Sequence, residues 1–158
     1  MTPAINIAKK AGVPHRTHEY AHDPAHASYG MEAAEKMGVA PERVFKTLVV
    51  MLETKELVVA VVPVSAMLNM KQIARAAAAK KAAMAPAADV QRSSGYVLGG
   101  VSPLGQKKRL RTFIDTSAQA FATMFVSAGR RGLEIELSPA DLAKLTSGTF
   151  ADLAAADD

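Results

Sequence analysis

Short runs of β-branched and aliphatic residues dominate the middle of the chain, and they predict β-strands. The segments VFKTLVVM (44–51) and LVVAVV (57–62) are separated by the polar LETKE, which is the pattern of a β-hairpin. LEIEL (133–137) alternates apolar and acidic residues, as a half-exposed strand does. Three more short strands are predicted at 95–101, 111–116 and 122–129.

Four segments combine helical periodicity with recognisable start signals. The predicted helices are 3–11, 29–37, 69–80 and 138–146. Ser138 can cap the last of them, and Pro139 suits its first position. Leu137 and Leu142, which flank this cap, can form a hydrophobic staple.

The alanine-rich segment 74–88 extends the third helix in this interpretation. Alanine is the best helix former, so the first half of the segment should continue a helix that Asn69 caps. Pro86 stops any helix near that point. Ser28 is the corresponding cap of the second helix, after a loop that contains Tyr20 and HDPAHA.

The order of these elements decides the fold class. Strands and helices follow one another irregularly, without the strict β–α alternation that a doubly wound Rossmann sheet requires. The pattern predicts the α+β class, with a mixed, curved, barrel-like sheet flanked by helices. A length of 158 residues predicts a single domain, 1–158. No apolar run approaches the ~20 residues that cross a bilayer, and the start lacks a signal-peptide pattern.

Composition narrows the chemistry. Aromatic residues make up 5% of the chain and Trp is absent, so the core is expected to consist of aliphatic side chains, Met and Ala. The absence of Cys excludes disulfides, thiolate metal sites and a cysteine nucleophile, and makes the cytoplasm the expected compartment. A net charge of +4 is a mild bias towards an anionic partner.

Four histidines within twelve residues raise the question of a metal site. Their spacing fits no zinc motif, and Glu19 and Asp23 are the only carboxylates among them. We therefore expect neither a metal nor a cofactor. The four residues are His15, His18, His22 and His26.

Lys46 interrupts a strand that is otherwise suited to burial. In a strand of period two, Lys46 shares one face with Val44 and Leu48, while Thr47 lies on the other face. A lysine among such neighbours either reaches solvent at a sheet edge or points into a pocket. The pattern alone leaves both interpretations open.

The stretch GGVSPLGQKKRL (99–110) resembles a phosphate-binding loop only superficially. A P-loop requires lysine directly after its last glycine, but Gln106 follows Gly105 here. Pro103 also removes a backbone N–H that a phosphate cradle uses. These departures exclude a nucleoside-triphosphate site.

The glycines of this stretch suit a different chemistry. Gly99 and Gly100 allow a ligand to approach the main chain, and their N–H groups suit a carbonyl oxygen that becomes negative during acyl transfer. The segment VSAGRRG can bring Ser127 and Gly129 to the same place. No G-x-S-x-G motif marks an activated serine.

A basic run follows the glycines at once. It is either a solvated face or a surface for a phosphodiester backbone, whose contribution to binding would fall as salt rises. Both interpretations stay open. The run consists of Lys107, Lys108, Arg109 and Arg111.

Several motifs occur in a fixed order along the chain. They are MTPAI, YAHDP, VFKTLVV, QRSSGYVLGGVSPLGQKKRL, FIDTSAQAF and VSAGRRGLEIEL. Together, and over essentially the whole chain, they closely resemble the YbaK/EbsC family of Cys-tRNA(Pro) deacylases, relatives of the editing domain inserted in bacterial prolyl-tRNA synthetases. The combination of the Lys46 strand with GGVSPLGQKK is specific for this family, whereas either motif alone is not.

The resemblance implies an α+β fold and a free-standing hydrolase or lyase. The enzyme would remove cysteine from the 3′-terminal ribose of Cys-tRNA(Pro) or of Cys-tRNA(Cys). The resemblance further implies a complex with prolyl-tRNA synthetase. In this branch the thiol of the substrate attacks the ester carbonyl and releases a cyclic thiolactone. Such a protein needs no nucleophile, only a pocket that folds the cysteinyl group and donors for the oxyanion.

The resemblance also implies roles for individual residues. Lys46 matches the family's key lysine, and Gly99 and Gly100 match its glycine loop. Glu134 stands where relatives often carry Asp, which keeps the charge but lengthens the side chain by a methylene. The expected substrate-binding residues are Tyr20, Tyr29, Thr47, Ser102, Pro103, Ser127, Gly129 and Glu134. Lys107, Lys108 and Arg109 are expected on the tRNA backbone.

Two other functions remain open. The same fold can deacylate Ala-tRNA(Pro) with an activated water, and a non-catalytic tRNA-binding module that supports a synthetase would carry the same basic run. The choice between cysteine and alanine depends on pocket volume, which the sequence does not reveal.

Overall fold

The computed structural model describes residues 1–26 and 28–155. The helices are α1 (Pro3–Ala11), α2 (Tyr29–Met37), α3 (Met70–Ala76), α4 (Ala87–Ser94) and α5 (Pro139–Thr146). The strands are β1 (His15–Glu19), β2 (Phe45–Leu52), β3 (Leu57–Pro63), β4 (Ala82–Met84), β5 (Thr112–Asp115), β6 (Met124–Arg130), β7 (Leu133–Leu137) and β8 (Thr149–Ala151). Short 3₁₀ turns, Pro41–Arg43 and Thr116–Ala120, precede β2 and follow β5.

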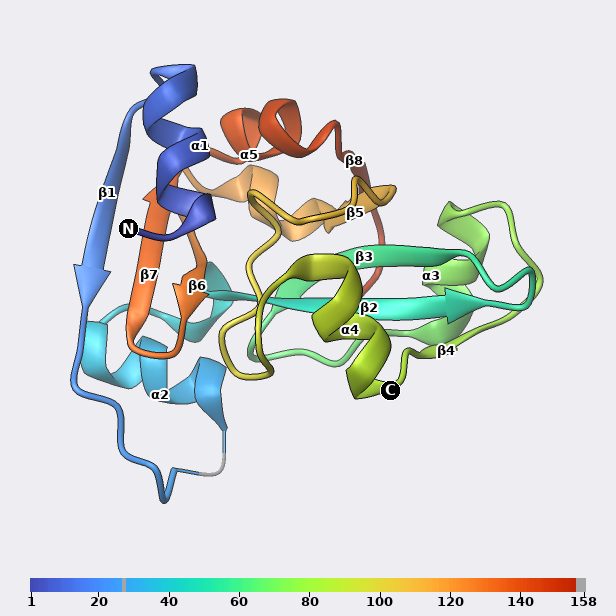
Figure 1. Ribbon diagram of the computed structural model, residues 1–158, viewed down its shortest axis with the longest axis horizontal. Coiled ribbons are helices and arrows are strands. Elements are labelled where there is room, and N and C mark those ends of the chain that lie inside the picture. Colours follow the sequence, from blue (N-terminus) through green and yellow to red (C-terminus); the bar gives the residue numbers. More distant parts are fainter. Residues whose placement is uncertain (27, 156–158) are drawn as a thin grey trace.

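The strands form two sheets (Figure 1). β1, β7 and β6 form an antiparallel three-stranded sheet in that order. The other sheet has the order β4-β2-β3-β5-β8, in which β2 is antiparallel to both neighbours and β3, β5 and β8 are parallel. A parallel bridge from Val44 to Phe125 joins the start of β2 to β6. The predicted α+β class with mixed, curved strands is confirmed, and the strands are divided between two sheets rather than closed into one barrel.

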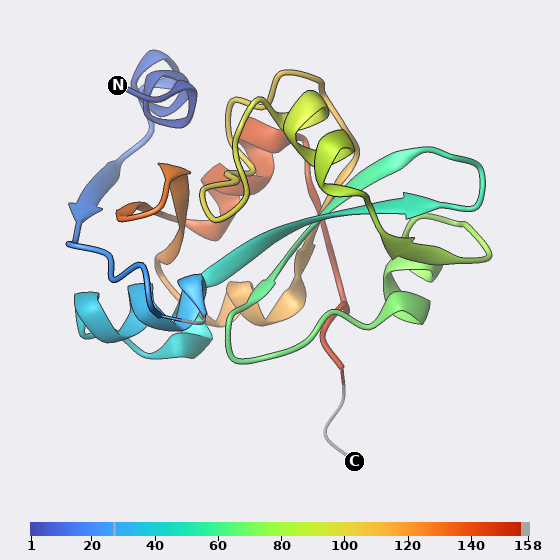
Figure 2. The same cartoon turned by 60° about the horizontal axis from the view of Figure 1, so that its bottom comes forward.

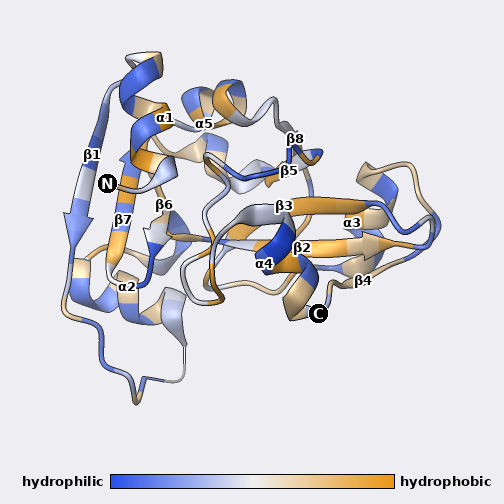
Figure 3. Cartoon of the chain, in the orientation of Figure 1, coloured by the Kyte–Doolittle hydropathy of each residue, from blue (hydrophilic) through white to orange (hydrophobic). Residues whose placement is uncertain are grey.

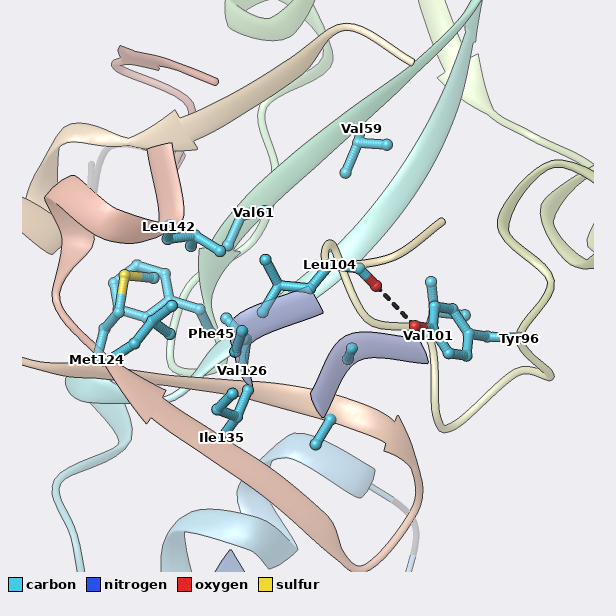
Figure 4. Packing of buried hydrophobic residues seen from close by; sticks show 14 of the residues in the cluster. Phe45, Val59, Val61, Tyr96, Val101, Leu104, Met124, Val126, Ile135 and Leu142 are labelled. Atoms are coloured by element: carbon cyan, nitrogen blue, oxygen red, sulfur yellow. Dashed lines mark hydrogen bonds between the residues drawn. The ribbon is translucent and has the colours of Figure 1, made fainter. Parts of the chain in front are cut away.

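The main core lies between the two sheets. α1 and α2 cover opposite faces of the three-stranded sheet (Figure 2). β2 and β3 are strongly hydrophobic strands (Figure 3), and their buried side chains meet those of β6, β7 and α5. Figure 4 shows members of this cluster: Phe45, Val61, Met124, Val126, Ile135 and Leu142. A separate cluster packs the far end of the β2–β3 hairpin against α3 and includes Val50, Leu52 and Ile73.

The predicted hairpin and helix starts are confirmed. β2 and β3 pair antiparallel along their lengths. Ser28, Asn69 and Ser138 cap α2, α3 and α5, because the side-chain oxygen of each accepts from a backbone N–H in the first turn. Leu137 and Leu142 are both buried in the main core. In the described ranges, no helix has the length and hydropathy that a membrane crossing needs.

The prediction of a strand at 95–101 is wrong. This segment is a loop after α4, a helix that the sequence pattern did not predict. Gly95 ends α4 in the left-handed conformation, with a φ of 81°. Gly99 has a φ of 91° in a turn closed by a 3.0 Å hydrogen bond from the Gly100 N–H to the Val97 carbonyl. Two left-handed residues so close together exclude a strand.

The third helix is shorter than predicted. α3 ends at Ala76, and Ala78 turns the chain with a φ of 57°. The chain then pairs as β4 with residues 50–52 of β2. A strand partner therefore overrides the high helix propensity of alanine here. β1 and β8 were not predicted either, because their partners define them rather than their own hydrophobic pattern.

Candidate active site

A cavity of about 400 Å³ opens between the start of β2, the N-terminus of α2, the loop after α4 and the β6–β7 pair. It brings together predicted site residues from six separate segments: Tyr20, Tyr29, Lys46, Thr47, Gly99, Ser127 and Glu134. Seven further residues line the cavity that were not predicted as site residues: Ser28, Gly30, Val44, Phe45, Leu48, Leu98 and Val101. A second hollow, of about 390 Å³, lies between α1 and β1 and contains none of the predicted site residues.

Lys46 lies in the wall of the cavity. β3 pairs with β2 along this stretch, whereas β4 reaches only residues 50–52 of β2. Partial burial lowers the pKa of Lys46. Among the described residues, no carboxylate lies within ion-pair distance of its ammonium group. Of the two interpretations of this lysine, the structure favours the pocket, and it leaves the ammonium available to a ligand oxygen.

Glu134 gives the cavity a neutral carboxyl group. It lies on β7 directly opposite Ser127 of β6, and only 6% of it is exposed. Burial raises the pKa of Glu134 to about 8, so its carboxyl is mostly protonated at neutral pH. The pKa of Tyr20, on the same cavity wall, is raised first by burial and then by the nearby charge of ionised Glu134. Near pH 7, Glu134 and Tyr20 therefore offer neutral O–H donors to a ligand rather than negative charges.

The two hydroxyl groups in the cavity differ in their partners. The Ser127 Oγ accepts a 3.1 Å hydrogen bond from the Gly129 N–H, which fixes the side chain against its own bulged strand. The Thr47 Oγ1 is buried and has no hydrogen-bond partner in the described structure. The Gln72 Oε1 on α3 and the Arg131 Nε are buried without a partner in the same way, so this feature does not by itself mark a ligand contact.

The two adjacent glycines have different surroundings. The N–H of Gly99 makes no hydrogen bond within the described chain, and Gly99 touches the Tyr29 ring, because an added Cβ would lie 3.1 Å from its Cε2. Gly100 lies behind the cavity against the backbone of Arg130, where a Cβ would come within 2.6 Å of the Cα. The Gly100 N–H is already bonded to Val97. The expected pair of free N–H donors is therefore reduced to that of Gly99.

Three other predicted residues do not line the cavity. Ser102 is fully buried, and its Oγ accepts from the Leu104 N–H. Pro103 lies at a separate small hollow beside Lys108 and Arg109. Gly129 packs against Tyr96 and Thr2. The structure thus assigns these residues to the framework behind the site, and the Tyr96 hydroxyl fixes that framework by donating to the Leu104 carbonyl at 2.6 Å (Figure 4).

The basic run is divided by the structure. Lys107, Lys108 and Arg109 are exposed on the loop that continues from the cavity, and backbone bonds from the two lysines to Ser93 and Ser94 anchor this loop to α4. Arg111 instead pairs with Glu56 at 2.8 Å and lies over the Phe113 ring. The first three residues remain accessible to an anionic partner, and of these Arg109 also donates to the Ser147 Oγ.

A buried ion pair beside the cavity was missed by the sequence analysis. Arg131 donates to Glu32 at 3.1 Å and to the Asp23 carbonyl at 2.7 Å, and its guanidinium lies 4.3 Å from the centre of the Tyr29 ring. Burial alone would raise the pKa of Glu32, but the Asp23 N–H and Arg131 hold it below its usual range. Arg131 therefore holds Tyr29 and the loop before α2 in place. No periodicity marks this contact, because it joins residues about a hundred positions apart.

The histidines serve separate contacts. His15 bonds the Val13 carbonyl, His18 pairs with Glu136 at 2.9 Å, and His26 lies 3.3 Å from Glu35. Across residues 1–26 and 28–155, no three His, Asp or Glu side chains are grouped as metal ligands would be.

Comparison with known proteins extends these observations. Residues 23–145 match the family model described as aminoacyl-tRNA editing domain. The Enterococcus faecalis protein named "Putative Cys-tRNA(Pro)/Cys-tRNA(Cys) deacylase EbsC" is 38% identical over 152 residues, which are 96% of this chain and 92% of that protein.

Two solved structures share the fold. One, described as "a putative trans-editing enzyme for prolyl tRNA synthetase", has a TM-score of 0.84 at 21% identity and is matched over 98% of this chain and 96% of that one. The other, hypothetical protein APE2540, has a TM-score of 0.86 at 24% identity over 97% of this chain and 99% of that one. The same arrangement of strands and helices thus occurs in both structures.

Proposed function

This chain belongs to the aminoacyl-tRNA editing domain family, and we propose that it removes cysteine from Cys-tRNA(Pro) as a free-standing deacylase. The E. faecalis relative supports this substrate, because its name includes Cys-tRNA(Pro) and Cys-tRNA(Cys) and it matches 96% of this chain. The whole chain, 1–158, acts as one editing domain in the proposal.

The observation that carries the proposal is a largely apolar cavity that holds Lys46 and Glu134 but, among the described residues, no serine or cysteine nucleophile beside a histidine base. The chain has no Cys, and no histidine is among the described residues that line the cavity. The hydroxyls of Thr47 and Ser127 therefore have no imidazole base beside them. A nucleophile that the ester itself carries, or a water molecule, can take the place of an activated hydroxyl in such a site.

In the proposal, the thiol of the cysteinyl group is the nucleophile that attacks the ester. Its sulfur bonds to the carbonyl carbon, the bond from that carbon to the ribose oxygen breaks, and the thiol proton ends on the ribose hydroxyl that is released. The products are the free tRNA and a cyclic thiolactone, which water then opens to cysteine. The protein contributes by holding sulfur and carbonyl carbon together, which intramolecular reactions show to be worth several powers of ten in rate.

Each cavity residue has a part in this proposal. The Lys46 ammonium and the free Gly99 N–H donate to the oxygen that becomes negative. Neutral Glu134 and Tyr20 donate hydrogen bonds to the cysteinyl group, and Ser127 and Tyr29 complete the wall.

The rest of the tRNA binds outside the cavity. Lys107, Lys108 and Arg109 are exposed and belong to the loop that continues from Gly99, so they contact the phosphates behind the charged end. We further propose that the protein works in the cytoplasm beside prolyl-tRNA synthetase, which would select the tRNA. The described trans-editing enzyme for that synthetase, which shares the fold, suggests this partner.

One assay tests the proposal against its two alternatives. Purified protein is incubated with Cys-tRNA(Pro), Ala-tRNA(Pro) and Ser-tRNA(Pro), and loss of the ester is followed. Preferential loss of cysteine supports the proposal. Preferential loss of alanine would favour water attack in the same cavity, and retained tRNA binding without any deacylation would favour a non-catalytic module.

A further inference from the structure

A second hollow lies between α1 and β1, on the face of the three-stranded sheet opposite the cavity. Its volume is about 390 Å³, against about 400 Å³ for the cavity. Leu133 lines this hollow and its neighbour Glu134 lines the cavity, because successive residues of a strand point to opposite faces. α1 covers the one face and α2 covers the other (Figure 2). The second hollow, which we call the α1 hollow, shares no described lining residue with the cavity.

Positive charge is in excess in the α1 hollow. Lys9 of α1 and Arg130 of β6 supply two cationic side chains, whereas Glu19 of β1 is the one carboxylate among the described lining residues. His15, at the start of β1, adds an imidazole. Because an excess of one sign of charge raises the local concentration of the opposite sign, the hollow favours an anion.

Arg130 keeps unused hydrogen-bond donors. Its guanidinium lies 3.8 Å from the Glu19 carboxylate, which is too long for a hydrogen bond, and 56% and 74% of the two side chains are exposed. An exposed pair of this kind contributes little to stability, so a bound anion can compete for the guanidinium. Leu133 pairs with both residues in the sheet. The wall of the hollow thus offers a guanidinium, which binds anions through two N–H groups at once, beside an apolar side chain.

Lys9 and His15 also keep unused polar groups. The Lys9 Nζ lies 3.2 Å from the Met1 sulfur, a weak acceptor, and no carboxylate of the described residues is within ion-pair distance of it. The His15 Nδ1 is 2.8 Å from the Val13 carbonyl. Because a carbonyl only accepts, Nδ1 carries the proton of the neutral ring, and Nε2 has no hydrogen-bond partner in the described ranges. Both side chains are therefore available to a shared ligand.

The floor of the α1 hollow is apolar. Ile5 of α1 and Leu133 of β7 line it and are almost fully buried. Thr17 adds a hydroxyl on the β1 side. The volume lies in the range of ~300–1,000 Å³ that is typical of small-molecule sites, which combine apolar walls with a few polar groups. An anion bound here therefore has room for an organic group attached to it.

We propose that the α1 hollow binds a phosphate ester, with Arg130 and Lys9 on the phosphate oxygens and the organic part against Ile5 and Leu133. A tetrahedral phosphate presents oxygens to cations that approach from different elements, and guanidinium and ammonium groups are its usual partners. The ester is either a phosphodiester of RNA or a free phosphomonoester such as a sugar phosphate. The inference is independent of the proposed deacylation, because no residue assigned to that reaction lines the hollow.

Nuclear magnetic resonance of the full-length protein tests the site directly. Signals of Lys9, His15 and Arg130 are followed in about 0.1 M NaCl, which screens distant charges, while inorganic phosphate, ribose 5-phosphate or an RNA oligonucleotide is added. These signals should shift saturably, and those of Lys46 report on the cavity separately. Saturation by ribose 5-phosphate would identify a free ester as the ligand, and saturation by RNA alone would identify its backbone. Acetate, a planar anion with a single charge, should bind about tenfold more weakly than phosphate or worse.

The double variant Lys9→Gln/Arg130→Gln should bind the phosphate probes about tenfold more weakly or worse, because two charge-assisted contacts are lost. The matched control, Lys10→Gln/Arg92→Gln, removes the same charge outside the hollow. Lys10 is exposed on α1, and Arg92 forms a loose 3.5 Å pair with Asp89, as Arg130 does with its own partner. The control should bind within about twofold of the wild type. The substituted side chains are all exposed, so circular dichroism melts should show an unchanged fold.

Glu19→Gln should have the opposite effect. It removes the carboxylate that competes for Arg130 and repels the anion, so phosphate should bind a few-fold more tightly in the same titration. Because this variant leaves both cations in place, it also tests the site should the double variant fail to fold.

The proposal is overturned if no phosphate probe shifts these signals saturably below about 10 mM. It is also overturned if acetate binds as tightly as phosphate, or if the double variant and its control bind alike. A Glu19→Gln variant that binds phosphate more weakly than the wild type would contradict an anion in the hollow.

Discussion

The two ends of β2 have different surroundings, although they belong to one continuous strand. At its start, Lys46 and Thr47 face a cavity, and a lysine ammonium and a threonine hydroxyl remain without protein partners. At its far end, Val50 and Leu52 are buried against Ile73 of α3. A lysine ammonium without an ion-pair partner is unusual in a cavity wall, so Lys46 marks the end of β2 at which a ligand can supply what the protein does not.

Glutamate side chains show the same contrast. Glu134, at the cavity, has its pKa raised by burial. Glu53, beside the far end of β2, has its pKa lowered by the N–H groups of Lys80 and Lys81, which donate to its carboxylate. The far end satisfies its charges, whereas the cavity keeps an acid neutral. Two strand ends of similar hydrophobicity are thus distinguished by how their polar groups are satisfied.

The largest effect is expected for Lys46→Ala at the cavity end. Removal of a group that donates to the developing oxyanion should lower kcat/KM for Cys-tRNA(Pro) by about 100-fold or more, while Tm changes little. Lys46→Met, which keeps most of the stem, should lose the same activity. Deacylation rates and thermal melts of both variants provide the measurement, and wild-type activity in either would remove Lys46 from the site.

Leu52→Ala should give the opposite result at the far end. Leu52 is 3% exposed within the cluster that packs on α3, so truncation should cost about 2–5 kcal/mol of unfolding free energy. Below the unfolding temperature, kcat/KM should stay within a few-fold of the wild type. Denaturant unfolding and the same deacylation assay check both values, and a catalytic loss larger than that of Lys46→Ala would contradict the division between the two ends.

The raised pKa of Glu134 predicts that stability depends on pH above 4.5, whereas the lowered pKa of Glu53 at the far end affects stability only at lower pH. The pKa of Glu134 is about 8 in the folded chain and 4.5 in the unfolded chain, so the folded state binds the extra proton between these pH values. Stability should therefore fall as pH rises from about 4.5 to 8. The melting temperature of Glu134→Gln should fall clearly less than that of the wild type over this range, because a pKa difference of this size corresponds to roughly 5 kcal/mol and about 1 kcal/mol already moves the Tm of a domain of this size by a few degrees. Equal pH profiles of the two proteins would show that Glu134 is ionised when folded.

The smallest effect concerns the exposed lysines and arginine of the basic run. Neutralising Lys107, Lys108 and Arg109 should weaken tRNA binding and reduce the slope of log Kd against log salt by about 2 to 3, one phosphate per charge. The matched control neutralises three exposed lysines near the far end of β2: Lys55, Lys80 and Lys81. The control should leave the slope unchanged, and equal slopes for both triple variants would return the basic run to a solvated face.

The sequence predicted the parts of this molecule that local patterns define. The β2–β3 hairpin and the Ser28, Asn69 and Ser138 caps follow from β-branched runs and capping chemistry, so they were predictable. β1 was not, because its polar HRTHE becomes a strand only beside β7. The loop at 95–101 looked like a strand because its glycines interrupt an apolar run without revealing their left-handed conformation.

The candidate site also contains features that the sequence predicted and features that it did not. Lys46 stood out because it interrupts a buried strand, and the cavity does contain it. The neutral state of Glu134 and the Arg131–Glu32 pair depend on burial and on contacts between distant segments, which no local pattern records. Nor could the pattern of two adjacent glycines distinguish the free N–H of Gly99 from the bonded one of Gly100.

The central claim, that the substrate supplies its own nucleophile, is tested most directly by exchanging one atom of the substrate. With protein in excess, single-turnover rates of ester loss are compared for Cys-tRNA(Pro) and Ser-tRNA(Pro), which differ only in sulfur and oxygen. Proximity to the ester carbonyl favours attack by the cysteine thiol and by the serine hydroxyl alike. Only the thiol is a good nucleophile without a base beside it. The account predicts rapid loss of cysteine and little loss of serine above the uncatalysed rate, and equal rates for the two would contradict it.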